Sequence, residues 1–486
     1  MGVFVRAKQY FIRRTTVTLI ELLLSASAKN FLYLVRLGER LTSDEEARMA
    51  ISRIKSFLMD EDSPVRLLFE RILSTLPRRN RLKLFRTFFN GAIFKGCERR
   101  NRFEERYGYR PPFLLIISPT MACNLNCKGC YAQSYKRVGL SFEEFDRVLI
   151  EAQEMGVGFV TILGGEPFVY PHLFPIIKKH PEVFFQIYTN GTLMDRNKAR
   201  LLSKLGNTMV VSSIEGFEEQ TDARRGRGIF KKVMETMDML AEARVLQGTS
   251  STVTRHNVEA ISSDEFIDLV ISKGSIVQNY FLYLPVSGEK DLSLMVTPEQ
   301  REYLRQRDME IRDTKPIFIM DFWNDGPYVG GCIAGGRRYC HINAQGDIEP
   351  CVFTHFSVDN IRDKSLAEAF DSPLFREVRK RHPVNDNHLL PCMIIDNPWV
   401  FRDVIRTSGA RANHPGAETI ITELSDQLDE YAMRYAKVAE RTWREEYIAK
   451  GIGPYARQQA QKEASAEGRA REKILAGSLL NSCLNR

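Results

Sequence analysis

The sequence lacks several features that would assign it to a specialised class of protein. No apolar run is long enough to span a bilayer, because the best candidate, residues 16–24, contains Glu21 and is soon followed by Lys29. The 31 glycines and 20 prolines among 486 residues exclude a collagen-like or low-complexity chain. The net charge of +8 is too small over this length to require a nucleic-acid partner. With 43% hydrophobic and 27% charged residues, the composition is typical of a globular protein of about three domains.

The first 110 residues are predicted to form a helical N-terminal region. Basic residues before the apolar run imitate an export signal, but Glu21 and Lys29 favour an amphipathic helix that packs on the protein or on a membrane surface. Ser43 and Glu46 have the spacing of a helix capping box. Residues 77–96 combine basic side chains with phenylalanines at helical spacing. They predict either a surface for anionic lipid headgroups or a helix with a buried phenylalanine face, and the second is favoured because most amphipathic helices simply pack.

From residue 111 to residue 314, short β-rich runs alternate with helical stretches. Six such runs end in glycine, proline or polar residues, and each is followed by a segment with helical periodicity. This alternation predicts an α/β fold in which a parallel sheet curves into a partial, TIM-like (β/α)6 barrel. Ligands bind such barrels at the C-terminal ends of the strands. We therefore expect the functional residues of this region in the loops that follow the strands.

After residue 314 the alternation stops. Residues 315–400 contain short strands and turns with four cysteines, and a hairpin is predicted with its turn at Gln345, Gly346 and Asp347. Residues 401–486 return to a helical period and end in a polar tail. The chain is therefore expected to continue, after the barrel, with a small cysteine-containing domain and a C-terminal helical extension.

Three of the nine cysteines lie within eight residues, directly after the first predicted barrel strand. Cys123, Cys127 and Cys130 have the spacing Cys-x-x-x-Cys-x-x-Cys. An odd number of cysteines in a long chain favours metal or redox chemistry in a reducing compartment over a disulfide scaffold. Structural zinc normally takes four ligands, and neither a histidine nor a fourth cysteine is near in sequence. Three thiolates on a loop instead suit a 4Fe-4S cluster whose fourth iron is open to a small molecule.

This spacing, with Tyr131 after the last cysteine, resembles the signature of the radical S-adenosylmethionine (SAM) superfamily. The resemblance implies that the open iron binds SAM and that Tyr131 belongs to the cofactor site. It also implies that SAM is cleaved reductively to methionine and a 5′-deoxyadenosyl radical, which abstracts hydrogen from a substrate. A low-potential electron donor such as flavodoxin or ferredoxin is then required. Because export would expose the clusters to oxidation, we expect a cytoplasmic enzyme, at most peripheral to the inner membrane face.

Residues after the second and third predicted strands fit the same resemblance. Gly164, Gly165 and Glu166, followed by a proline, match the Gly-Gly-Glu-Pro motif of the family. The glycines permit close backbone approach, and the glutamate is expected to accept hydrogen bonds from the SAM ammonium group. Asn190 ends the third strand and is expected near the ribose or the methionine part of SAM.

Ser213 ends the fourth predicted strand, and Arg225 follows in the next segment. In the resembling SPASM-type members, these two residues hold the methionine carboxylate. The neighbouring Arg224 is an equal candidate for the arginine. Taken singly, each residue is a weak signal, because an arginine is usually a solvated surface residue. Their order behind the cysteine triad argues against coincidence.

The second cysteine set lies beyond the barrel and consists of Cys332, Cys340, Cys351 and Cys392. Gly346 stands five residues before Cys351, and this arrangement resembles the SPASM/twitch extension of the same superfamily. The resemblance implies one auxiliary 4Fe-4S cluster that the four cysteines close completely, with a structural or electron-relay role. A four-cysteine zinc site is the alternative. Only Cys97 and Cys483 are left over, so a second auxiliary cluster is not expected.

The candidate catalytic residues are Tyr283, Asp321 and Asp325. Tyr283, close to Pro285 at the end of the sixth predicted strand, is expected near adenine or substrate. Asp321 and Asp325, with Asn324 between them, are either substrate contacts or members of a turn whose hydrogen bonds are internally satisfied. The sequence does not decide between these two interpretations.

The sequence therefore predicts a radical SAM enzyme that abstracts hydrogen from an unidentified small molecule, lipid or peptide. The alternatives are a SPASM-type peptide or protein maturase, a membrane-surface enzyme that acts on lipid, and a non-catalytic zinc or iron–sulfur module. The helical N-terminal region does not match the β-containing leader-binding module of many peptide maturases. Val352 stands where sulfatase-maturing relatives carry an aspartate base, which argues against that mechanism. No nucleic-acid partner is expected.

Overall fold

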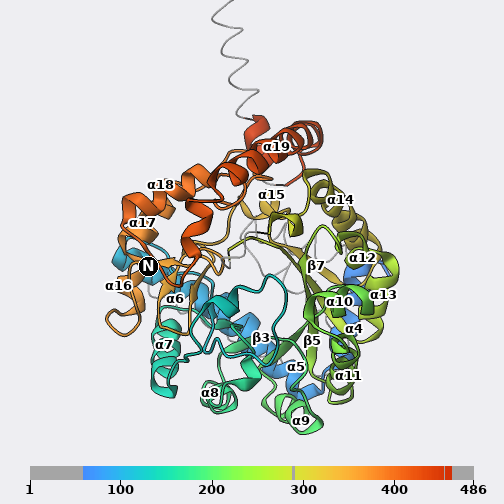
Figure 1. The fold of residues 1–486 in the computed structure, drawn as a ribbon. Coiled ribbons are helices and arrows are strands. Elements are labelled where there is room, and N and C mark those ends of the chain that lie inside the picture. Colours follow the sequence, from blue (N-terminus) through green and yellow to red (C-terminus); the bar gives the residue numbers. More distant parts are fainter. Residues whose placement is uncertain (1–58, 287–290, 454, 462–486) are drawn as a thin grey trace, which may run out of the picture.

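The computed structural model describes residues 59–286, 291–453 and 455–461 (Figure 1). The amphipathic helix expected near residues 16–24 and the capping box at Ser43 lie outside the described residues. Within the described part of the chain, no helix is both long and apolar enough to cross a membrane.

One mixed sheet of nine strands forms the centre of the molecule, in the order β7-β6-β5-β4-β3-β2-β1-β8-β9. The first eight strands in this order, which run from β7 through β1 to β8, all pair in parallel with their neighbours. The last strand, β9 (Ile348–Glu349), pairs antiparallel with β8. The parallel strands are β1 (Leu114–Ile117), β2 (Phe159–Ile162), β3 (Phe184–Thr189), β4 (Thr208–Ser213), β5 (Leu246–Val253), β6 (Ser275–Leu282), β7 (Phe318–Asp321) and β8 (Tyr339–Ile342).

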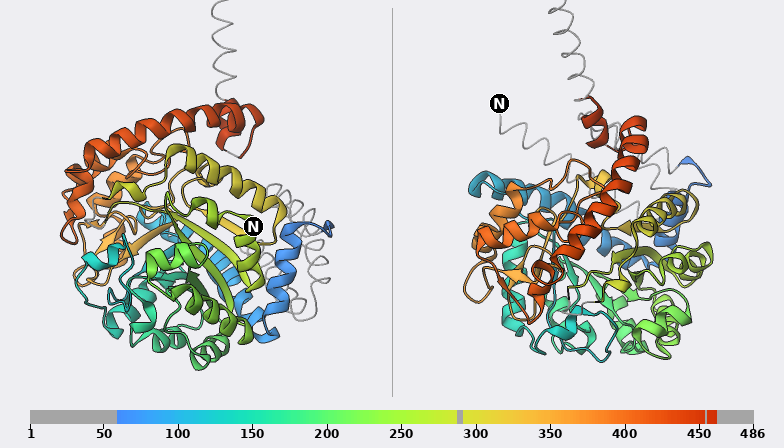
Figure 2. Two further views of the ribbon diagram at one scale, coloured as in Figure 1. Left: turned by 45° about the vertical axis from the view of Figure 1, so that its right-hand side comes forward. Right: turned by 45° about the horizontal axis from the view of Figure 1, so that its top comes forward.

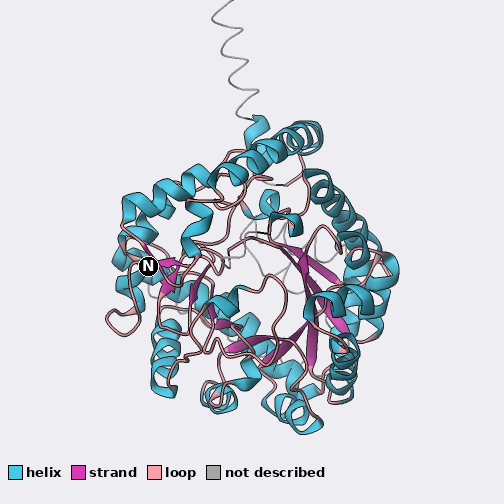
Figure 3. Cartoon of the chain, viewed as in Figure 1, coloured by secondary structure: helices cyan, strands magenta, loops and turns pink. Residues whose placement is uncertain are grey.

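The predicted repeats from β1 to β6 are present, which confirms the α/β barrel. Helices surround the curved sheet on its outside (Figure 3). They are α7 (Phe142–Glu154), α8 (Leu173–Lys179), α9 (Arg196–Leu205), α10 (Glu218–Arg225), α11 (Ile229–Glu242), α12 (Val258–Ile261), α13 (Asp264–Ser272) and α14 (Pro298–Thr314). The sheet also continues past the boundary expected at residue 314, because β7 joins β6 and β8 joins β1. The cysteine-containing region is therefore built onto the same sheet as the barrel.

Helix α7 illustrates why these elements form where they do. Ser141 Oγ accepts a hydrogen bond from the Glu144 backbone N–H at 3.1 Å, and the Glu144 carboxylate accepts from the Ser141 N–H at 2.8 Å. This capping box satisfies two donors that the start of a helix leaves open. Phe145 and Leu149, one turn apart, are fully buried in the same core cluster as Ile117 of β1.

The N-terminal helices lie against the N-terminal ends of the strands. They are α4 (Pro64–Thr75), α5 (Arg78–Leu84), the π-helical segment η1 (Phe85–Lys95) and α6 (Gly96–Tyr107). The Phe88 ring makes edge contacts with Phe159 of β2 and Phe184 of β3, at centroid distances of 5.5 and 5.3 Å. The apolar face expected for residues 77–96 therefore packs on the protein at Phe88, and this packing leaves the role of the basic side chains of the same segment open.

The last part of the chain packs against the barrel through α17 (Pro373–Lys380), α18 (Pro398–Ser408) and α19 (Ser425–Thr442), and α19 lies beside α14 (Figure 2). A buried ion pair joins the two parts. Arg301 of α14 donates to both Asp396 carboxylate oxygens, at 2.5 and 3.1 Å, and both side chains are fully buried. The Arg301 guanidinium also lies over the Tyr435 ring of α19, 3.8 Å from its centroid.

Short segments complete the region, with α15 (Gly326–Val329), α16 (Leu366–Phe370), β10 (Phe356–Ser357), β11 (Arg411–Ala412) and the π-helical η6 (Trp443–Ile448).

We expect Asp396→Ala to lower the free energy of unfolding by about 3–5 kcal/mol, because it leaves the Arg301 charge buried without a partner. The matched control is Asp429→Ala, which breaks the partly exposed pair with Arg402 and should cost about 0–1 kcal/mol. Urea denaturation monitors both variants. Equal losses in the two variants would show that the Arg301–Asp396 pair does not join the two regions.

Candidate functional site

The loop after β1 brings the first three cysteines together at the C-terminal ends of the strands. Cys123 Sγ accepts a hydrogen bond from the Leu125 backbone N–H at 3.4 Å. Burial raises the pKa of the Cys123 thiol, and the nearby thiols of Cys130 and Cys127 add to that increase. The three thiols therefore lie close together, as the ligands of one cluster must.

The two glycines after β2 let this loop pass close to the sheet. The Gly165 backbone N–H donates to Thr120 O at 2.9 Å, and the Glu166 N–H donates to Ala122 O at 2.9 Å. A Cβ atom on Gly165 would lie only 2.2 Å from Ala122 O. The close backbone approach expected of the glycines therefore occurs, and its partner is the cysteine loop itself.

Glu166 is fully buried and joins the ends of β2 and β3. Its carboxylate accepts hydrogen bonds from the Phe168 N–H at 3.0 Å, the Thr189 hydroxyl at 2.8 Å and the Asn190 N–H at 2.8 Å. Burial raises the pKa of Glu166, and these three donors oppose that effect. A carboxylate has about four acceptor positions, so one position is left for a further donor.

Asn190 lies beside the first cysteine, as its place at the end of β3 predicts. Its Nδ2 donates to Asn124 Oδ1 at 2.9 Å and approaches Cys123 Sγ at 3.7 Å. Because its backbone is held by Glu166, its side chain is aimed at the cysteine loop. Asn190 therefore links the loop to the third strand.

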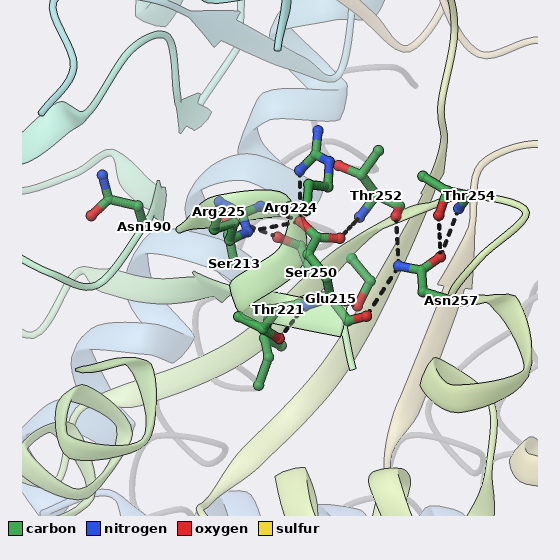
Figure 4. A network of polar contacts seen from close by, with 12 residues as sticks. Asn190, Ser213, Glu215, Thr221, Arg224, Arg225, Ser250, Thr252, Thr254 and Asn257 are labelled. Carbon is green, nitrogen blue, oxygen red and sulfur yellow. Dashed lines mark hydrogen bonds and ion pairs between the residues drawn. The ribbon is translucent and has the colours of Figure 1, made fainter. Parts of the chain in front are cut away.

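Glu215, which the sequence analysis did not identify, organises the end of β4 (Figure 4). This fully buried carboxylate pairs with Arg224 Nη1 at 2.7 Å and with Arg225 Nη2 at 2.5 Å, and it accepts the Thr252 N–H at 2.9 Å. Burial would raise the pKa of Glu215, but the two arginines lower it below its ordinary value. The only sequence signal for this role was an acidic side chain two residues after the end of a predicted strand.

Both candidate arginines lie near Cys127. Burial raises the pKa of the Cys127 thiol, and the guanidinium groups of Arg225 and Arg224 oppose that increase. The Lys128 N–H also donates to Arg224 O at 3.0 Å, which fixes α10 to the loop. Ser213 lies beside these arginines in Figure 4. The residues expected around the methionine carboxylate are therefore neighbours of the cysteine loop.

Tyr283 packs against the same loop from the end of β6. A Cβ atom on Gly129 would lie 2.5 Å from Tyr283 Cε2, so only glycine fits between Cys127 and Cys130 at this point. Gly129 also has a φ of +67°. Tyr283 is thus next to the cysteine loop, as expected for a residue near cofactor or substrate.

Asp321 and Asp325 belong to a satisfied turn, the second of their two interpretations. Asp321 is buried, and its Oδ1 accepts the N–H groups of Trp323 and Asn324, each at 2.9 Å. Asp325 pairs with Arg312 at 2.7 Å and accepts the Asp321 N–H at 3.0 Å. Burial raises the pKa of Asp325 to about 6. The structure uses both carboxylates locally, so neither is supported as a substrate contact.

Three cysteines of the second set share one local geometry. Each sulfur accepts the backbone N–H two residues further on, from Ala334 to Cys332 at 3.4 Å, from Phe353 to Cys351 at 3.5 Å and from Ile394 to Cys392 at 3.4 Å. Cys123 in the first set has the same contact. Burial is the main cause that raises the pKa of Cys351 and of Cys392, and the Cys332 thiol raises both pKa values further. N–H groups aimed at sulfur stabilise thiolate ligands.

Cys340 does not lie with these three cysteines, so the structure does not support its assignment as a fourth ligand. Successive strand residues point to opposite faces, and on β8 it is Tyr339 that reaches the set, with its hydroxyl 3.0 Å from Cys351 Sγ. Cys340 points into the apolar core with Leu115 and Ile117, and it is fully buried. Burial alone raises its pKa well above the ordinary value, with no neighbouring charge to oppose it.

Tyr131 connects the two cysteine sets. Burial raises the pKa of Tyr131, and the thiols of Cys130 in the first set and Cys351 in the second both contribute. The Tyr131 ring also contacts Phe353, at a centroid distance of 6.3 Å, and His355, at 5.0 Å. The two sets are therefore neighbours across one aromatic ring.

A buried polar network holds the hairpin of Cys351 against β1. His341 Nδ1 lies 2.5 Å from Glu349 Oε2, and His341 Nε2 lies 2.7 Å from the Ser118 hydroxyl, directly after β1. Tyr135, just after the cysteine loop, donates to Glu349 Oε1 at 3.0 Å. Ser118, His341 and Glu349 are each fully buried. The network thus links the first cysteine loop to the second set.

Cysteine sulfur is the usual ligand of iron–sulfur clusters, and both sets consist of free cysteines. Among the described residues, no group of three or more histidine, cysteine, aspartate or glutamate side chains is arranged to hold a single metal ion. A zinc ion requires its ligands to converge on one point. In a 4Fe-4S cluster each cysteine binds a different iron, so the sulfur atoms stand further apart.

Comparison with known proteins agrees with this geometry. The radical SAM superfamily model matches residues 117–270, and the SPASM iron–sulfur cluster-binding domain matches residues 332–401. The mycofactocin maturase MftC of Mycobacterium tuberculosis is 30% identical, with 56% of this chain and 74% of the relative covered. The AdoMet-dependent heme synthase of Methanosarcina barkeri is 25% identical, with 55% and 85% covered. The sporulation killing factor maturation protein SkfB of Bacillus subtilis is 26% identical, with 53% of this chain but only 64% of the relative covered. From these matches, this chain belongs to the radical SAM superfamily and carries a SPASM iron–sulfur domain.

Proposed function

We propose that this radical SAM enzyme cleaves SAM reductively at a 4Fe-4S cluster held by Cys123, Cys127 and Cys130, and that it abstracts hydrogen from an organic substrate. The observation that carries the proposal is the grouping of three thiols at the C-terminal ends of the strands, beside the buried Glu166. With SAM on its open iron, such a cluster supplies the electron that breaks the sulfonium C–S bond.

The surrounding residues bind and orient SAM in this proposal. Glu166 offers its remaining acceptor position to the SAM ammonium group. Arg224 and Arg225 share the single charge of Glu215, so the pair keeps a net positive charge beside Cys127. That charge favours the methionine carboxylate, with Ser213 as a further donor. Asn190 and Tyr131 complete the site from the two sides of the loop.

Cys332, Cys351 and Cys392 are proposed to hold one auxiliary 4Fe-4S cluster. The N–H group aimed at each sulfur supports this role, and the Tyr339 hydroxyl adds a second donor at Cys351. Because Tyr131 lies between the two cysteine sets, clusters bound there would be neighbours, with a short route for electrons between them. A low-potential donor such as flavodoxin or ferredoxin would supply them.

The substrate is proposed to carry an apolar group. Half-buried aromatic rings run from β3 to the second cysteine set, with centroid distances of 5.9 Å from Tyr188 to Phe281, 4.6 Å from Phe281 to Phe322 and 6.4 Å from Phe281 to Phe353. Such a surface favours carbon-rich groups, because burying apolar area is its main source of binding energy. A peptide side chain and a lipid chain both meet this requirement. The maturases among the relatives favour the peptide.

We expect Cys127→Ala to abolish SAM cleavage, since it removes a ligand of the cluster that cleaves SAM. The matched control is Cys340→Ala, which should keep the wild-type rate because Cys340 lies in the apolar core. Each protein is reconstituted anaerobically with iron and sulfide, and 5′-deoxyadenosine is quantified after adding dithionite and SAM. Wild-type loading should reach about eight iron per chain. Bound zinc without SAM cleavage in the wild type would instead support a non-catalytic module.

Cys351→Ala is expected to leave some SAM cleavage while turnover of the substrate falls, because it removes only a ligand of the auxiliary cluster. Iron content should drop by about four per chain, whereas Cys340→Ala should lose none. Full iron content and full turnover in Cys351→Ala would contradict the auxiliary role.

Tyr339→Phe should lower the reduction potential of the auxiliary cluster. Its hydroxyl lies 3.0 Å from Cys351 Sγ, and because a thiolate ligand can only accept, the hydroxyl would donate to it and stabilise the more negative, reduced state. EPR-monitored potentiometry measures the shift. The control is Tyr280→Phe, whose hydroxyl donates to Ile261 O away from both cysteine sets. Identical potentials in the wild type and Tyr339→Phe would show that this contact does not act on the cluster.

A further inference from the structure

A basic groove lies at the edge of the barrel opposite the cysteine loop. It has a volume of about 440 Å³ and is lined by Arg78, Arg79, Lys83 and Arg86 of α5 and η1, and by Pro181 and Glu182 between α8 and β3. Glu182 directly precedes the N-terminal end of β3, whereas the cysteine loop follows the C-terminal end of the parallel strand β1. The groove is thus separate from the proposed SAM site.

The groove carries a strong excess of positive charge. Four basic side chains face one carboxylate, and Arg78, Arg79 and Arg86 are exposed. Arg86 already has an interaction partner, whereas neither Arg78 nor Arg79 forms an ion pair with another described residue. Burial lowers the pKa of Lys83, the neighbouring Arg79 lowers it further, and only Glu182 opposes them. An anion bound between these groups would relieve their mutual repulsion.

The helical segments that carry these charges, α5 and η1, are fixed because their other face packs on the barrel. Phe88 contacts the first residues of β2 and β3, and Asn80 Nδ2 donates to Ser203 O at 2.8 Å. Leu76 and Leu84 pack in the same apolar cluster. The basic side chains are therefore presented from a backbone that is already docked on the barrel, which reduces the entropy lost on binding.

Two features favour a membrane surface over a free phosphate compound. Sites for free phosphate usually aim backbone N–H groups at the anion, whereas this groove is lined by long side chains on a helix surface. In addition, clusters of basic side chains on a helix surface are typical of proteins that lie on anionic membranes.

We propose that this groove binds the phosphate-bearing headgroups of anionic lipids and docks the N-terminal face of the barrel on a membrane surface. The docking is independent of the SAM chemistry, because the groove and the cysteine loop lie at opposite ends of the strands. Each cation near an anionic surface strengthens binding by about fivefold.

The test is flotation of the full-length, reconstituted protein with vesicles. The wild type should bind vesicles of phosphatidylcholine and phosphatidylglycerol in equal parts, and should not bind phosphatidylcholine alone. Arg78→Ala with Arg79→Ala should weaken binding by about 30-fold, at about fivefold for each cation removed. The matched control, Arg434→Ala with Lys437→Ala, removes two exposed cations from α19 and should bind like the wild type. Formation of 5′-deoxyadenosine should be unchanged in both double variants.

Three results would overturn the proposal. The first is equal binding of both double variants to the mixed vesicles, which would place the lipid contact elsewhere on the chain. The second is equal binding of the wild type to both kinds of vesicle, which would exclude headgroup charge as the cause. The third is that the wild type does not bind vesicles but becomes more thermally stable with inorganic phosphate, and that Arg78→Ala with Arg79→Ala abolishes this gain. That result would assign the groove to a free phosphate compound.

Discussion

The buried carboxylate of Glu349 is the constraint that brings the two cysteine sets together. It interacts with His341 on β8 and accepts hydrogen bonds from Tyr135 after the cysteine loop and from Asn413 near the C-terminal helices. Burial alone would raise the pKa of Glu349, but His341 and its other partners keep it below the ordinary value. A charged group this deep is tolerated only because its partners surround it. Because these partners come from distant segments, the network also fixes how those segments meet.

Around this network, the structure separates two kinds of cysteine. The sulfur atoms of Cys123, Cys332, Cys351 and Cys392 each receive a backbone N–H from two residues further on, and Cys127 lies near two arginines. Cys340 instead lies in the apolar core cluster. A thiol becomes a ligand by losing its proton, and donors and positive charge favour that loss at the cysteines that are proposed to bind iron. Position in the sequence alone does not make that distinction.

Features that are local in sequence were predictable, and features that depend on strand direction or long-range contacts were not. The triad of Cys123, Cys127 and Cys130 depends on spacing within one loop, and the barrel on the alternation of strand and helix. The core position of Cys340 was not predictable because β8 is four residues long, too short to show which of its faces meets the core. Glu215 was missed because its importance comes from arginines nine and ten residues away.

The most direct test of the account is electron paramagnetic resonance of the anaerobically reconstituted, dithionite-reduced protein, recorded with and without SAM. The account predicts signals from two reduced 4Fe-4S clusters, of which one changes when SAM binds to its open iron and the other does not. If no reduced cluster is detected, or if no signal responds to SAM, the three thiols after β1 do not hold a SAM-binding cluster and the proposed chemistry has no source.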